Sequence, residues 1–124
     1  MEYKIIGDNL LAVVCRLRRG EELYCESGAM SWMDDCFRME TEGGGIGKVF
    51  GRMFSGESLF RNRYIAENDG EIAFASTFPG SIRAVQISPG HGIIAQKRSF
   101  LASEKGVDMS VFFQKKLSGG FFGG

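Results

Sequence analysis

Hydrophobic and polar residues alternate one by one along much of the chain. In 11–18, one side of the segment carries leucine, valine and cysteine, and the other side becomes basic towards its end. The same alternation recurs in 37–42 and 107–111. Successive side chains of a β-strand point to opposite faces, so this pattern predicts strands with one buried face.

Further short apolar segments are also predicted strands. They are 22–25, 29–33, 59–66, 71–75, 82–87 and 92–97. Glycine, proline, asparagine and aspartate cluster between them, as at 68–70 and 88–90, and these residues favour turns. Many short strands with regular turns predict an all-β fold, either a sandwich or a barrel.

The clearest alternations also predict which side chains are buried. We expect the core to receive Phe37, Met39, Val107, Met109 and Val111. We expect solvent to receive Arg38, Glu40, Asp108 and Ser110. Truncating a residue of the first set should therefore destabilise the fold far more than truncating one of the second.

The glycine-rich segment 43–60, GGGIGKVFGRMFSGESLF, does not fit a phosphate-binding loop. A P-loop requires G-x-x-x-x-G-K-[ST], but Val49 follows Lys48 and Glu42 replaces the first glycine. The apolar spacing instead predicts one short helix near residues 46–54. Its apolar face is a candidate interaction surface, made by Ile46, Val49, Phe50, Met53 and Phe54. This face either covers the end of the β core or meets a partner chain or a membrane surface.

Length and charge limit the classes of function. A chain of 124 residues suits a single β domain. Its fifteen basic and fifteen acidic residues balance, which argues against binding to nucleic acid. No apolar run approaches the ~18 residues of a membrane span, and the first residues do not resemble a signal peptide. We expect a cytoplasmic protein with no transmembrane segment.

An internal repeat is one interpretation of the chain. A shift of 70 residues (109 − 39) places Met39 on Met109 and Gly20 on Gly90. Either two similar units occupy about 1–66 and 71–124, the second lacking its last strand, or the similarity is fortuitous. A missing strand would leave backbone groups and apolar side chains, among them Phe112, Phe113, Phe121 and Phe122, to pair with another chain.

Residues with obvious chemistry are sparse. His91 is the single histidine and lies in a predicted turn. Cys15, Cys25 and Cys36 belong to different predicted strands or their flanks, without the close spacing of a zinc site. The nucleophile motif G-x-S-x-G does not occur. We expect inert thiols, no metal, no cofactor and no enzyme activity.

Two binding functions remain as alternatives. The first is contact with RNA or another polyanion through Arg16, Arg18, Arg19, Arg61 and Arg63. Aromatic residues near such clusters can stack on bases. The second is a small-ligand pocket within the β core, lined by Met30, Trp32 and Met39.

Several motifs resemble those of the AIM family, named for altered inheritance of mitochondria. They are ESGAM at 26–30, GGG at 43–45, SGESLF at 55–60, FPG at 78–80 and FLAS at 100–103. The resemblance spans nearly the whole chain. It implies a β-sandwich of the double-stranded β-helix type, similar to the tryptophan RNA-binding attenuation protein. It also implies self-assembly but no reaction. We therefore expect a non-enzymatic β scaffold that forms a homo-oligomer, as a ring or trimer.

Overall fold

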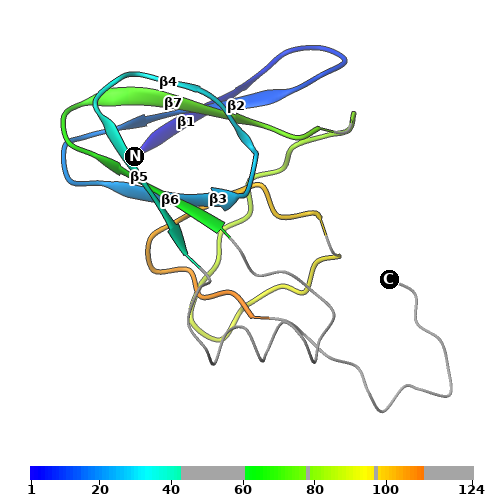
Figure 1. Cartoon of the computed structure of the whole chain (residues 1–124). Helices are drawn as coiled ribbons and strands as arrows, with labels where there is room; N and C mark the ends of the chain where they lie inside the picture. Colours follow the sequence, from blue (N-terminus) through cyan, green and yellow to red (C-terminus); the bar gives the residue numbers. More distant parts are fainter. Residues whose placement is uncertain (43–60, 78, 97, 111–124) are drawn as a thin grey trace, which may run out of the picture.

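Two antiparallel sheets form the fold (Figure 1). The computed structural model describes residues 1–42, 61–77, 79–96 and 98–110. The strands of this part are β1 (Glu2–Ile6), β2 (Ala12–Leu17), β3 (Glu22–Glu26), β4 (Met30–Met33), β5 (Phe37–Glu42), β6 (Arg61–Ala66), β7 (Gly70–Ala75) and β8 (Ala102–Glu104). Sheet A has the order β1-β2-β7-β4, and sheet B has the order β5-β6-β3-β8. The all-β prediction is confirmed.

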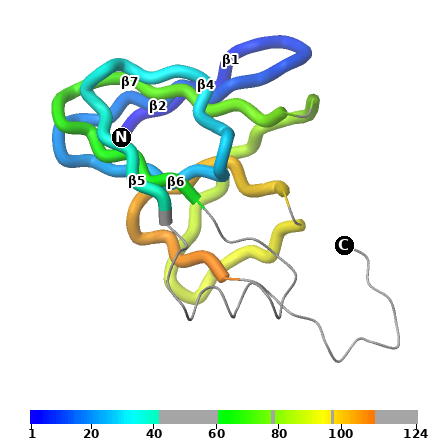
Figure 2. Tube along the Cα trace, in the orientation of Figure 1, coloured from blue at the N-terminus to red at the C-terminus, as the bar shows by residue number. Residues whose placement is uncertain are grey.

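Alternation along the strands places one face of each sheet in a common core. Figure 2 shows the strands of sheet A lying over those of sheet B. Leu17 and Phe74 come from sheet A, Leu23 and Tyr64 come from sheet B, and all four are at most 2% exposed. The rings of Tyr64 and Phe74 meet edge to face, with centroids 6.1 Å apart. Such aromatic contact stabilises packing beyond the area that it buries.

Side chains packed closely against the backbone explain the glycine that begins β7. A Cβ atom on Gly70 would lie 2.5 Å from the Cys36 sulfur and 3.2 Å from a carboxylate oxygen of Asp34. The thiol of Cys36 in turn donates to the carbonyl oxygen of Asn68, at 3.4 Å. The turn between β6 and β7 is thus packed against the link between β4 and β5. This contact joins the margins of the two sheets.

The sequence predicted six of these strands and misplaced others. β2 to β7 all overlap predicted segments, whereas β1 and β8 were not predicted. The prediction of a strand at 82–87 is wrong, and residues 92–96 and 107–110 are not strands either. None of these segments pairs with a strand in the described part of the chain. Without that ladder, an extended propensity does not become a strand.

The burial predictions hold for Phe37 and fail for Met39. Phe37 is 7% exposed, as expected, but Met39 is 49% exposed. Met39 does lie on the inner side, opposite Tyr64. However, β5 is the edge strand of sheet B, so its end overhangs the core. The prediction that Met109 is buried is also wrong. Its side chain is 36% exposed, because 107–110 are not a strand.

Other predictions lie outside the described residues. They concern the helix near 46–54 with Ile46, Val49, Phe50, Met53 and Phe54, the strand residues 59 and 60, the inward-pointing Val111, and the four C-terminal phenylalanines. The division into two repeated units stays a prediction. Among the described residues, no helix is long and apolar enough to cross a membrane.

We predict that Phe37→Ala lowers the free energy of unfolding by about 3–5 kcal/mol, because it empties a buried site. Met39→Ala should lower it by less than about 1 kcal/mol, because that side chain is half exposed. Urea unfolding followed by circular dichroism measures both values. Equal losses at the two positions would show that the end of β5 is covered in solution.

Candidate functional site

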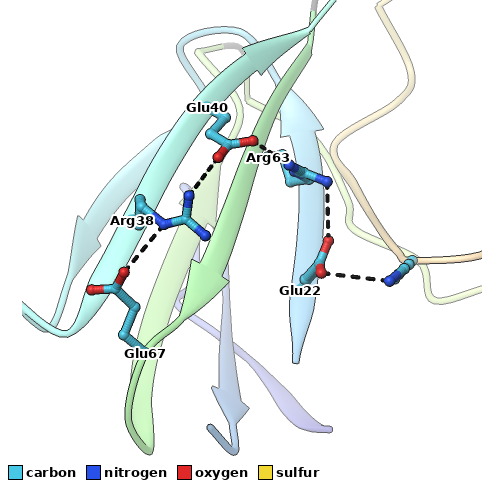
Figure 3. Close-up of polar contacts among 6 residues, drawn as sticks. Glu22, Arg38, Glu40, Arg63 and Glu67 are labelled. Atoms are coloured by element: carbon cyan, nitrogen blue, oxygen red, sulfur yellow. Dashed lines mark hydrogen bonds and ion pairs between the residues drawn. The ribbon is translucent and has the colours of Figure 1, made fainter. Parts of the chain in front are cut away.

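A chain of ion pairs crosses the outer face of sheet B (Figure 3). Arg38 lies 3.1 Å from a carboxylate oxygen of Glu67 and 2.6 Å from one of Glu40. Arg63 pairs with the other oxygen of Glu40, and it also lies 3.5 Å from Glu22. The second oxygen of Glu22 is 3.5 Å from the ammonium group of Lys105. The network therefore links β5, β6 and β3 to the residue that follows β8.

Strand register builds this network. Leu23 and Tyr64 point into the core, so their neighbours Glu22 and Arg63 point outward. Pairing of β5 with β6 sets Glu40 directly opposite Arg63. Opposite charges that face each other across two strands stabilise their pairing. The outward position predicted for Arg38 and Glu40 is thus correct, and their ion pairs are what the alternation could not reveal.

The network is electrically neutral. It contains three carboxylates (Glu22, Glu40 and Glu67) and three cationic groups (Arg38, Arg63 and Lys105). Arg61 shares the outer face of β6 with Arg63, as expected, and its guanidinium lies 4.3 Å from the centre of the Tyr24 ring. These arginines therefore act mainly within the sheet.

Two of the other predicted arginines, Arg16 and Arg18, line a separate hollow of about 700 Å³. Arg16 pairs with Glu71 at 3.1 Å, and the backbone N–H of Arg18 donates to Glu21. The backbone N–H of Arg19 donates to Asp69. The carboxylates that line this hollow are Glu2, Glu21, Asp34, Asp69 and Glu71. The two arginine clusters thus form no continuous basic surface.

A smaller hollow of about 270 Å³ lies beside the turn that follows β3. Residues Glu26 to Ala29 form one wall, and they belong to the motif ESGAM. Ser76, Arg98 and Phe100 form part of the other walls. Arg98 has a φ angle of 72°, which is uncommon for a residue with a side chain. The hollow combines hydroxyl, cationic and apolar groups.

The predicted ligand pocket does not coincide with this hollow. Neither Met30, Trp32 nor Met39 lines it. Trp32 is 45% exposed and lies beside Ala73 in sheet A, whereas Met39 belongs to sheet B. The structure therefore does not bring these three side chains into one enclosed space.

The thiols are buried or engaged, in keeping with inert cysteines. Burial raises the pKa of Cys15 to about 11 and that of Cys25 to about 12. A thiol with such a pKa carries little of the reactive thiolate. His91 lies in the predicted turn, where its backbone N–H donates to the carbonyl oxygen of Ser88 at 2.8 Å. In the described part of the chain, no three histidine, cysteine or acidic side chains are grouped to hold a metal.

The sequence did not predict the apolar edge of sheet A. All five residues of β1 are exposed, and they include Tyr3, Ile5 and Ile6. The signal was present in the alternation of Glu2, Tyr3, Lys4 and Ile5. It was too short to be separated from a loop.

We predict that Glu40→Gln makes thermal stability less sensitive to acid. The hydrogen bond from Arg63 lowers the pKa of Glu40 from its ordinary value of 4.5. A lowered pKa in the folded state stabilises the fold above the unfolded pKa, and this stabilisation is lost as the pH falls. Melting temperatures from about pH 6 to about pH 3 should thus fall more for the wild type than for the variant. Identical slopes would mean that the ion pair is absent in solution.

Comparison with known proteins supports the same fold. The chain is 32% identical over 79 residues to an uncharacterised protein of Streptococcus pyogenes serotype M6, with 57% of this chain and 32% of that protein covered. It also matches the crystal structure of a Streptococcus pyogenes protein with a TM-score of 0.63 and 23% identity, over 84% of this chain and 50% of the other. The chain therefore spans about a third to about half of these relatives' length.

A family model gives the broadest match. The model described as mitochondrial biogenesis AIM24 matches residues 3–124, which include all but the first residue of the two sheets and the motifs ESGAM, SGESLF and FLAS. The resemblance inferred from those motifs is thereby confirmed. The chain belongs to the mitochondrial biogenesis AIM24 family.

Proposed function

We propose that this protein is a non-enzymatic, self-assembling β scaffold whose sandwich is of the double-stranded β-helix type. The observation that carries the proposal is the apolar surface of the described residues. Tyr3, Ile5 and Ile6 of the strand β1 are 52%, 38% and 45% exposed. Large apolar side chains exposed together on one strand are typical of protein–protein contact. Four strands at the margins of the two sheets (β1, β4, β5 and β8) further support association.

A second candidate function is the binding of a small ligand. The hollow beside the ESGAM turn supports it, because motif residues and Arg98 both line it. A polar ligand with a negative group would suit the hydroxyl and guanidinium groups there. This candidate does not conflict with self-assembly, since the hollow involves no residue of β1.

Self-assembly is tested by sedimentation velocity of the whole chain over a range of concentrations. We expect a species larger than the 13.7 kDa monomer at micromolar concentration, with a share that grows as concentration rises. A monomer at every concentration would overturn the scaffold proposal. A ring or trimer would appear as one closed species rather than a continuous series.

Polyanion binding is tested by filter binding of a single-stranded RNA. We predict negligible binding by the wild type at about 0.15 M salt, because Glu22 and Glu40 neutralise Arg63. The variant Glu22→Gln/Glu40→Gln should bind more tightly and with a steeper salt dependence. Adding Arg63→Gln to that variant provides the matched control. Tight, salt-dependent binding by the wild type would instead support the polyanion function.

A further inference from the structure

The strand β1 has one paired edge and one open edge. It pairs with β2 from Glu2↔Arg16 to Ile6↔Ala12. No described strand pairs with its other edge, because β1 stands at the end of sheet A. All of its side chains are exposed, and the loop from β1 to β2 stands away from the body of the fold (Figure 2). An open edge of this kind can add a strand from another chain.

The inner side of β1 is apolar but uncovered. Tyr3 and Ile5 lie opposite Cys15 and Val13, which are both buried in the core. They therefore continue the core side of sheet A. Yet Tyr3 is 52% exposed and Ile5 is 38% exposed. The core side of sheet A thus extends onto β1, where sheet B does not cover it.

We propose that β1 pairs with β1 of a second copy in antiparallel orientation, about a twofold axis at Tyr3. This inference rests on the proposed self-assembly and names the surface that produces it. The pairing would join two copies of sheet A, each with four strands, into one continuous sheet. The occupant of the open edge is therefore another copy of this chain.

Backbone geometry restricts the possible registers. In an antiparallel pair, opposite residues either both direct their N–H and C=O groups to each other or both direct them away. This direction alternates from one residue to the next, so two residues that face each other across a twofold axis must be an even number of positions apart. The axis must therefore pass through a residue of β1, not between two residues. Centring on Lys4 would set two lysines directly opposite each other, and centring on Glu2 would do the same with two glutamates. Like charges in these positions destabilise the pair.

Centring on Tyr3 makes the charges complementary. Glu2 of each copy then faces Lys4 of the other, so the symmetry forms two ion pairs on the outer side of the sheet. On the inner side Tyr3 meets its own copy, and Met1 meets Ile5. These three are exposed apolar residues in the single chain. Charge and apolar surface thus favour the same register.

Charge reversal tests the interface and its register together. In Lys4→Glu, Glu2 would face a glutamate of the other copy. The dissociation constant of the assembly at low salt should therefore rise about tenfold or more. The swapped variant Glu2→Lys/Lys4→Glu restores opposite charges in the same register and should recover association. An equimolar mixture of Glu2→Lys and Lys4→Glu should likewise recover association, although each variant alone associates more weakly than the wild type. Sedimentation velocity measures all of these species.

A matched control distinguishes the effect of net charge on assembly from the effect of register. Arg83→Glu changes the net charge as Lys4→Glu does, at an exposed position outside β1, and should assemble as the wild type does. Circular dichroism melting of each variant verifies that the fold persists, notably for Glu2→Lys, whose position faces Arg16.

The outcomes separate this inference from the proposed function. If the wild type is monomeric, both fail. If the wild type assembles and Lys4→Glu assembles equally well, the inference at β1 is overturned while self-assembly stands. If Lys4→Glu dissociates but neither the swapped variant nor the mixture recovers, the register centred on Tyr3 is wrong.

Discussion

The fold depends on the closure of two sheets over one continuous apolar layer. Leu17, Ile72 and Phe74 from sheet A meet Leu23 and Tyr64 from sheet B, and none is more than 2% exposed. Removing this much apolar surface from water is the main favourable contribution to folding a domain of this size. The outward positions of the same strands are a consequence of this closure. Each inward residue forces its neighbour outward, so the buried layer determines where the charged network lies.

The two faces and edges of the sandwich have different chemistry as a result. The outer face of sheet B is polar and neutralises its own charges, which suits a surface in contact with water. The edge of sheet A at β1 is apolar and has an open backbone. A surface whose charges are already paired gains little stability from a partner chain, whereas an apolar edge with unpaired backbone groups gains much. This asymmetry, more than any single residue, is the reason for proposing assembly through sheet A.

Local alternation was sufficient to predict most strands but not which strands pair in a sheet. The pattern in 11–18 and 37–42 identified β2 and β5, because the alternation of a strand is a property of adjacent residues. The exposure of Met39 depends instead on β5 being at the edge of its sheet, which is decided by residues distant in sequence. The same holds for the arginines. Their clustering is visible in the sequence, but the carboxylates opposite Arg63 and Arg16 are brought there only by cross-strand register.

The two core thiols make the separation of the sheets observable. Cys15 belongs to sheet A and Cys25 to sheet B, and each is at most 5% exposed. An alkylating reagent in solution reaches them only when the layers part, so its slow reaction reports how often the sandwich opens. Cys36 lies nearer the surface and would report local fluctuation of the margin. The alkylation rates of the native cysteines therefore distinguish local fraying of the margin from opening of the whole sandwich. No further cysteine or label has to be introduced.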